Sequence, residues 1–175
     1  CNEISRHLDL HLLNPQPLGK SVIRLKSTGA VLNSSRVRTA AENQILRERG
    51  CRVAIYQLQG HLNFGTTEVF LRDVIERLDE LDCLVLDFKR ALSINESASR
   101  FLHRLLLKLS SRGKSLVVVH AQTIPLLRKY MKKKLDRDFD SLYLSFEDID
   151  RGLEWCENRL LAASISGWKV DRAVG

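Results

Sequence analysis

The chain has 175 residues, of which 44% are hydrophobic and 28% charged, and these ordinary globular values exclude collagen, long disorder and a disulfide-stapled miniprotein. The length is typical of one domain with some additional chain. The net charge is +7, but only 6% of the residues are aromatic, so we expect a solvated basic surface and no nucleic-acid partner. No apolar run reaches the roughly 18 residues of a transmembrane segment.

Residues 1–50 precede the regular part of the sequence. Residues 11–17 contain two prolines and are typical of a linker, 21–26 are strand-like, and 40–49 are helix-like and end at Gly50. The only methionine is Met131 and residue 1 is Cys1, so we expect a piece of a longer protein. The sequence therefore predicts an irregular N-terminal segment before the domain.

Alternation of side chains predicts a strand over residues 52–59. Gly60 interrupts the pattern, and 62–64 is predicted to be a second strand that closes an antiparallel hairpin. Thr66 or Thr67 is predicted to cap the next helix, whose apolar residues run from Val69 to Leu81. Residues 83–88 are almost continuously apolar, which is typical of a strand buried on both faces.

The second half continues the alternation of strands and helices. Residues 89–95 are predicted to be a loop, and Asn95 to cap a helix that runs to about Arg112 and ends at a left-handed Gly113. A strand at 115–120, a helix from Pro125, a short strand at 142–144 and a helix over 147–161 follow, and 163–175 form a tail. This order predicts an α/β fold with a mixed β-sheet and helices packed on it.

No catalytic or metal-binding arrangement is predicted. Ser111 and Lys114, and likewise Ser166 and Lys169, have the S-x-x-K spacing, which brings a lysine to a nucleophilic serine only inside a helix. Gly113 and Gly167 disfavour a helix at these places. The five histidines are scattered, and although His7 and His11 are four residues apart, no third metal ligand accompanies them.

The four cysteines, Cys1, Cys51, Cys83 and Cys156, have no CxxC or zinc spacing. We therefore expect no cofactor and no metal. Because no secretory signal is visible, a reducing cytoplasmic location is expected.

The segment from Ser93 to Ser99 follows a buried strand and begins a helix. A helix N-terminus with small polar residues attracts anions and phosphoryl groups, although simple capping by Asn95 is the favoured explanation from these residues alone. The helix then carries Arg100, Arg104, Lys108 and Arg112 at a spacing of four, which suits an acidic partner or a solvated face. A second basic helix is predicted over 125–134. It could contact an anionic membrane, but the favoured interpretation is a basic face exposed to water.

Several of these pieces together resemble a STAS domain, the module of sulfate transporters and anti-sigma-factor antagonists. They are Leu58–Phe64, Leu84–Phe88, Ile94–Ala98, Arg112–Lys114 and Glu154–Glu157, and the resemblance covers about two-thirds of the chain, from Val53 to Leu161. It implies a STAS-like fold without enzymatic activity that binds a protein partner, with a nucleotide or another anionic ligand as a further candidate.

The resemblance also locates a site. In the antagonist branch an Asp-Ser pair at the helix start is phosphorylated, but here Asn95 and Glu96 stand in those positions and Ser97 follows. The carboxylate of Glu96 either imitates a charged state or marks a site that is no longer used. The resemblance therefore predicts a partner surface at this helix start; its residues are Asn95, Glu96, Ser97, Ala98, Arg100 and Arg104.

Residues 1–13 resemble the end of the catalytic domain of bacterial glutaminases, some of which carry a STAS domain behind it. This resemblance implies three parts: 1–50 as the tail of a catalytic domain plus a linker, 51–162 as the STAS domain and 163–175 as a tail. The expected function is regulatory, with the parent's own catalytic domain or another subunit as partner. The parent would hydrolyse L-glutamine; this chain would not. The alternatives are a cytoplasmic STAS domain of an anion transporter and a free anti-sigma-factor antagonist.

Overall fold

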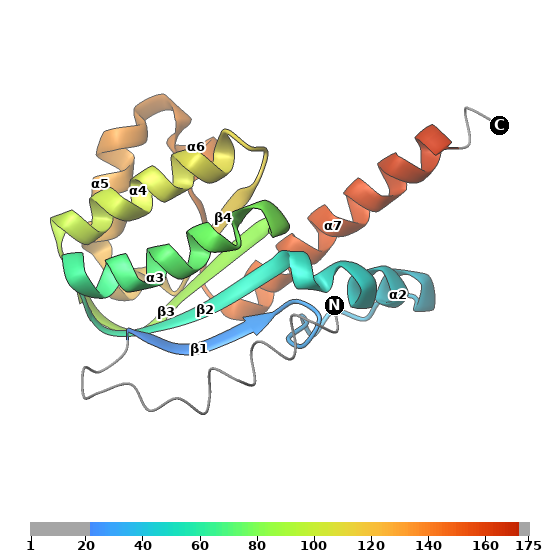
Figure 1. The fold of residues 1–175 in the computed structure, drawn as a ribbon, viewed down its shortest axis with the longest axis horizontal. Coiled ribbons are helices and arrows are strands. Elements are labelled where there is room, and N and C mark those ends of the chain that lie inside the picture. The colour runs from blue at the N-terminus through green and yellow to red at the C-terminus, as the bar shows by residue number, and fades with distance from the viewer. Residues whose placement is uncertain (1–21, 172–175) are drawn as a thin grey trace.

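A computed structural model describes the backbone of residues 22–171 and the side chains of residues 22–164 (Figure 1). The predictions for 1–21, which include the linker, His7, His11 and the glutaminase-like segment, lie outside this range. The described part contains one five-stranded mixed sheet in the order β1-β2-β3-β4-β5. The strands are β1 (Ile23–Thr28), β2 (Val53–Leu62), β3 (Cys83–Ile94), β4 (Ser115–Val119) and β5 (Leu144–Phe146). Only β1 pairs antiparallel with its neighbour, and the other strands are parallel.

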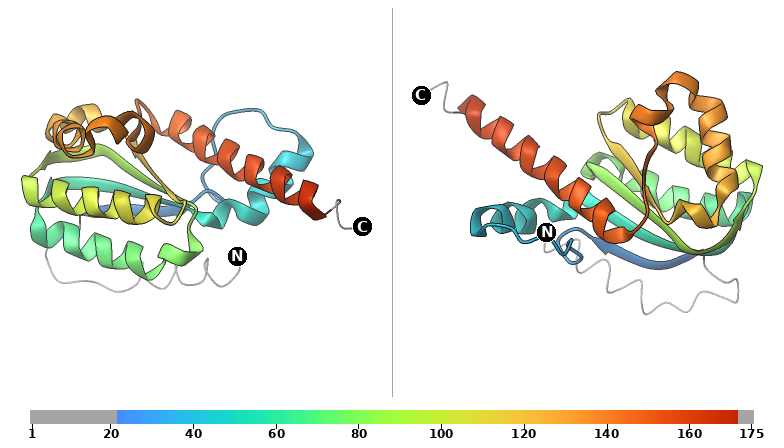
Figure 2. Two further views of the ribbon diagram at one scale, coloured as in Figure 1. Left: turned by 90° about the horizontal axis from the view of Figure 1, so that it is seen from above. Right: turned by 180° about the vertical axis from the view of Figure 1, so that it is seen from behind.

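Helices cover both faces of the sheet (Figure 2). The larger core lies under α3 (Phe64–Glu76), α4 (Glu96–Ser110), α5 (Pro125–Leu135) and the short α6 (Phe139–Leu142). The smaller core lies under α2 (Ala40–Arg49) and α7 (Ile149–Asp171). The predicted α/β fold, with a mixed sheet and helices packed on it, is confirmed. No helix within residues 22–171 is both long enough and apolar enough to cross a bilayer.

The central strand β3 is buried on both sides, as its apolar run predicts. Leu84 and Leu86 belong to the larger core, whereas Cys83 and Val85 belong to the smaller one, since successive side chains of a strand point to opposite faces. The α7 helix lies very close to β4, because a Cβ on Gly152 would come within 2.6 Å of a methyl group of Val119. A glycine is needed there for the close packing of helix on strand.

The predicted hairpin at 52–64 is wrong. β2 runs without a turn to Leu62 and pairs in parallel with β3, and the antiparallel edge of the sheet comes from β1 instead. Gly60, at a φ of 72°, lies where the register with β3 shifts, so it forms a bulge and not a turn. The helix cap is also different, because Asn63, and neither Thr66 nor Thr67, caps α3.

The predicted loop at 89–95 is wrong in the same way, since β3 continues to Ile94 and pairs with the end of β2. Near the C-terminus, the last helix extends to Asp171 through Gly167, so the tail predicted from residue 163 is helical over most of its length. The predicted strand at 142–144 is shifted to 144–146, behind the α6 turn. The division of the chain at residue 50 stays a prediction, although β1 and α2, which precede it, pack on the sheet and on α7.

Candidate functional site

The predicted site lies at the carboxyl end of β3, where α4 begins. The backbone N–H of Asn95 donates to the carbonyl of Leu62 at the end of β2, at 3.0 Å. The loop after β2 starts α3 at once, so the N-termini of α3 and α4 emerge side by side at one edge of the sheet (Figure 1). This edge is where open α/β sheets usually bind their ligands.

Asn95 caps α4, as predicted. Its Oδ1 accepts from the backbone N–H of Ala98 at 2.9 Å, and Ser99 Oγ donates to its carbonyl at 3.0 Å. Ala98 and Ser99 are completely buried, so they support the start of the helix from inside. Ala98 was predicted as a partner contact, but its side chain is not accessible.

The other predicted residues form one exposed surface, which we call the α4 surface: Asn95, Glu96, Ser97, Arg100 and Arg104. Glu96 and Arg100 lie 3.6 Å apart, one helical turn from each other, with 71% and 57% of their side chains exposed. An ion pair this exposed contributes little to stability, so both charges are available to a partner. Within residues 22–164, Arg104 forms no ion pair. Arg112, the last of the four cations that the sequence spaces four residues apart, forms an ion pair with Asp79 at 2.6 Å.

Two apolar residues beside the α4 surface were not predicted. Phe64, in the first turn of α3, is 56% exposed, and Leu92 in β3 is 69% exposed. The ring of Phe64 lies 5.2 Å from that of Phe101 on α4, so it bridges the two helix starts. The signal was present in the sequence: Asn63 and Thr66 cap each other's backbone N–H groups, a spacing that places Phe64 on a helix and not in a strand.

The histidines have separate surroundings. His61 Nδ1 lies 2.8 Å from Ser93 Oγ beside the site, and the ring of His103 packs edge-on against Tyr130, where burial first and then the charge of Lys134 lower its pKa. In the part of the chain whose side chains are described, no three His, Cys, Asp or Glu residues could hold a metal together.

The structure reveals a buried polar cluster around Asp87. Its carboxylate accepts from Gln57 Nε2 at 3.0 Å, and His120 Nδ1 lies 2.9 Å from it. His120 adopts a left-handed backbone conformation, with a φ of 56°, to reach it. The pair orders the strand ends, but no described serine or cysteine hydroxyl or thiol bonds to this histidine, as nucleophilic catalysis would require.

The S-x-x-K pairs do not form a catalytic unit in the described residues. Ser111 ends α4 and its Oγ donates to the carbonyl of Lys108, whereas Lys114 Nζ donates to the carbonyls of Asp79 and Leu81. The prediction that Gly167 keeps the second pair out of a helix is wrong, because the backbone of α7 is helical through Lys169. The side chains of Ser166 and Lys169 lie outside the described range.

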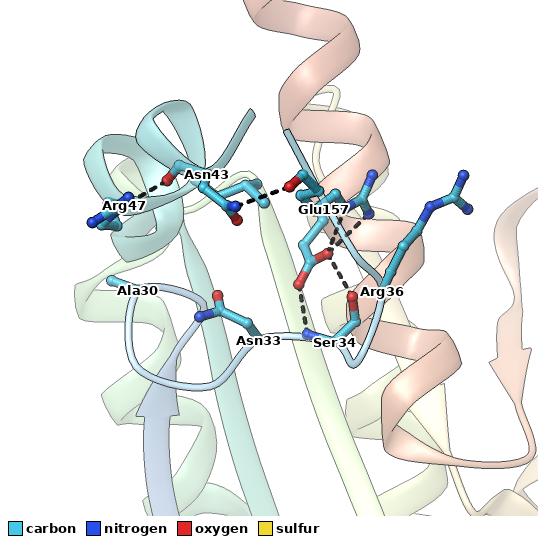
Figure 3. A pocket seen from close by; sticks show the side chains of 9 residues that line it. Ala30, Asn33, Ser34, Arg36, Asn43, Arg47 and Glu157 are labelled. Atoms are coloured by element: carbon cyan, nitrogen blue, oxygen red, sulfur yellow. Dashed lines mark hydrogen bonds and ion pairs between the residues drawn. The ribbon is translucent and has the colours of Figure 1, made fainter. Parts of the chain in front are cut away.

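A pocket of about 270 Å³ lies far from the α4 surface, between α2, α7 and the segment 30–38 (Figure 3). Its polar groups bond to one another. The carboxylate of Glu157 accepts from the N–H and Oγ of Ser34, both at 2.6 Å, and from Arg38 Nη2 at 2.9 Å. Next to it, hydrogen bonds from the backbone and side chain of Ser35 lower the pKa of Asp150. These contacts fix the segment on α7, so we regard the pocket as structural.

Comparison with known proteins adds two findings. The chain is 25% identical over 167 residues to Glutaminase 2 of Bradyrhizobium diazoefficiens, a match that covers 92% of this chain and 26% of that protein. The chain therefore spans about a quarter of the length of this relative, and it is homologous to the C-terminal region of a glutaminase over most of its own length. What the complete relative does is not thereby shown for this chain.

The similar solved structures include the following three. One is a crystal structure of Mglu, with 20% sequence identity and a TM-score of 0.39; the match covers 67% of this chain and 24% of that chain. Another is Mglu in its L-glutamate binding form in the presence of 4.3 M NaCl, with 17% identity and a TM-score of 0.36; the match covers 67% of this chain and 31% of that chain. The third is the unphosphorylated anti-sigma factor antagonist SpoIIAA, at 10% identity and 0.45, covering 62% of this chain and 89% of SpoIIAA. All three TM-scores are below 0.5, so they add nothing to the family assignment.

The second finding is a match to a family of known fold. Residues 44–149 match the STAS domain, and this range contains the four parallel strands and the helices α3 to α6 between them. It also contains the whole α4 surface. The match covers more than half of the chain and agrees with the resemblance of its motifs, and the chain therefore belongs to the STAS domain family.

Proposed function

We propose that this chain is a non-catalytic regulatory STAS domain, the C-terminal part of a glutaminase, and that its α4 surface binds the catalytic domain of the same protein or another subunit. The parent would convert L-glutamine to L-glutamate and ammonia. The similarity to Glutaminase 2 along nearly the whole chain supports this parent over an anion transporter or a free antagonist.

The observation that carries the binding role is the combination of charge and apolar area at one edge. The α4 surface presents exposed charged and polar groups, and Phe64 and Leu92 expose most of their side chains next to it. Aromatic residues with a polar, charged rim are typical of protein interfaces. Charge on such a rim selects the partner and speeds association.

We also infer a cytoplasmic location. Cys83 and Cys156 are buried free thiols between β3 and α7, and a hydrogen bond to Cys83, followed by burial, raises the pKa of the Cys156 thiol well above its usual value. Buried thiols with a raised pKa are unreactive, so these two can stay reduced in that compartment.

Charge reversal on the α4 surface tests the binding role. In a titration of this chain with the part of the protein upstream of Cys1, we expect Glu96→Lys, and separately Arg100→Glu plus Arg104→Glu, to weaken binding at least tenfold, because like charges then meet across the interface. Isothermal titration calorimetry measures the change.

Two matched controls accompany these variants. Glu68 and Arg72 on α3 form the same exposed pair one turn apart, at 3.2 Å, so Glu68→Lys makes the same charge change outside the surface. Lys133→Glu plus Arg137→Glu repeats the double reversal at the same spacing. If the α4 variants fold and bind with unchanged affinity, the α4 surface is not the binding site. If the control variants lose as much affinity as the α4 variants, the effect is one of overall charge and not of this surface.

We expect this chain alone to release no ammonia from L-glutamine. Ser111 and Lys114 are engaged with separate backbone carbonyls, so this pair offers no activated nucleophile. A coupled assay with glutamate dehydrogenase measures the release. Turnover above the buffer level that disappears in Ser111→Ala or Ser166→Ala would contradict the expectation.

A further inference from the structure

A second pocket lies along α5, at the carboxyl ends of β4 and β5. It has a volume of about 450 Å³, within the range of roughly 300–1,000 Å³ that is usual for small-molecule sites. One wall is the first two turns of α5, and the other is the end of β5 with the residue that follows it. We call this second pocket the α5 groove. Its lining residues are Ala121, Gln122, Pro125, Arg128, Lys129, Lys132, Ser145, Phe146 and Glu147.

Three cations of α5 line this one groove. Arg128, Lys129 and Lys132 lie within two turns of the helix, so they share a face. None of the three forms an ion pair with any residue in the described range. Several arginines elsewhere in the domain do form ion pairs, for example Arg52 with Asp82 at 2.5 Å and Arg112 with Asp79 at 2.6 Å. The groove therefore holds positive charge that no ion pair among the described residues neutralises.

Arg128 is held in place before any ligand binds. Its guanidinium carbon lies 5.8 Å from the centre of the Phe139 ring, a cation–π contact. A guanidinium fixed in this way loses less conformational entropy on binding, and its planar fork can bind two oxygens of a carboxylate or phosphoryl group at once.

The charge of the whole molecule is concentrated on the same side. α4 and α5 together contain eight Lys and Arg residues and one Glu, a net charge of +7, which equals the formal net charge of the complete chain. The remainder of the chain is neutral by the same count. A field of this kind attracts anions to the groove and raises their rate of association. The eight are Arg100, Arg104, Lys108, Arg128, Lys129, Lys132, Lys133 and Lys134.

The rest of the lining shapes the ligand. Ala121, Pro125 and Phe146 contribute apolar atoms to the lining, and charges attract each other more strongly beside apolar atoms than in open water. Gln122, in the turn before α5, donates from Nε2 to the backbone carbonyl of Glu147 at 3.3 Å and so joins that turn to the wall formed by β5. The carboxylate of Glu147 lowers the charge of the lining from +3 to +2. A ligand with a single negative charge would leave part of that charge unmatched.

We propose that the α5 groove is a binding site for a small anion with at least two negative charges, of the polycarboxylate or polyphosphate class. This site is separate from the α4 surface and does not depend on the proposed parent. Arg128 binds one anionic group through its fork, and Lys129 and Lys132 bind the second.

Calorimetric titration of the 175-residue chain with pyrophosphate and with citrate tests this site and separates the two sources of anionic oxygen. We expect saturable binding of at least one of them. Arg128→Gln and Lys132→Gln should each weaken it about tenfold, because each removes a hydrogen bond to a charged group. Glu147→Gln should strengthen it, because it removes the one negative charge of the lining.

Lys133→Gln and Lys134→Gln are matched controls, since they remove the same charge from the same helix outside the groove. We expect them to change the affinity less than twofold. Losses in the controls equal to those in the groove variants would overturn the proposal in favour of general attraction to a basic helix. Absence of saturable binding of both probes would overturn it outright.

Discussion

Replacing Leu105 with alanine is expected to lower the free energy of unfolding by about 2–5 kcal/mol, the range for large-to-small changes in a core. Leu105 is 3% exposed, and Leu102 and Leu109 on the same face of α4 are 1% and 0% exposed. The truncation would leave a cavity between α4 and the sheet that the neighbouring side chains cannot fill completely. The midpoint of urea unfolding, followed by circular dichroism, measures the loss.

Leu107 provides the control for Leu105. It lies two residues further along the same helix and is 43% exposed, so Leu107→Ala removes the same atoms and changes helix propensity equally. We expect a change within about 0.5 kcal/mol. Equal losses in the two variants would mean that α4 does not pack on the sheet through the face described.

Replacing Glu157 with alanine is expected to cost up to about 3–5 kcal/mol, because buried Arg38 then keeps only a hydrogen bond to Asn158 and a 4.0 Å contact with Glu42. Arg38 and Glu157 are 5% and 8% exposed at the side chain, and the carboxylate also accepts from the N–H and Oγ of Ser34. The substitution therefore removes several hydrogen bonds that hold the segment 34–38 on α7. Thermal and urea unfolding measure the global effect, and hydrogen exchange of 30–38 measures the local one.

Two further variants identify the cause. Glu154→Ala removes another carboxylate of α7, which pairs with Arg36 and is more exposed than Glu157, and we expect a much smaller loss. The double variant Arg38→Met plus Glu157→Leu should recover part of the stability of Glu157→Ala, because no charge then stays buried alone. No recovery in the double variant would show that the Ser34 contacts, and not the ion pair, matter.

The sequence was sufficient for elements with strong local signals. The start of α4 at Asn95 follows from capping chemistry that involves only neighbouring residues, and Gly113, three residues beyond the last helical residue Ser110, has the predicted left-handed φ of 68°. The double burial of β3 follows from its continuous apolar run, and the start of α5 from Pro125. The position of the α4 surface followed from the same local signals together with the family resemblance.

The errors occurred where distant residues decide the structure. Gly60 is an ordinary turn signal, and only the pairing of β2 with the extended end of β3 makes it a bulge. The 34–38 segment is held by residues more than 100 positions later in the chain, which no local pattern indicates. The α5 groove depends in the same way on β5, because the cations of α5 alone do not distinguish a pocket from a solvated face.

The most direct test of the central claim is hydrogen exchange of this chain with and without the part of the protein upstream of Cys1. If the α4 surface binds that part, amides of 93–104 become protected in the complex, and those of 125–135 on α5 keep their exchange rates. Protection confined to other regions, such as α2 and α7, with no change over 93–104, would contradict the proposal that the α4 surface is where this STAS domain binds its partner.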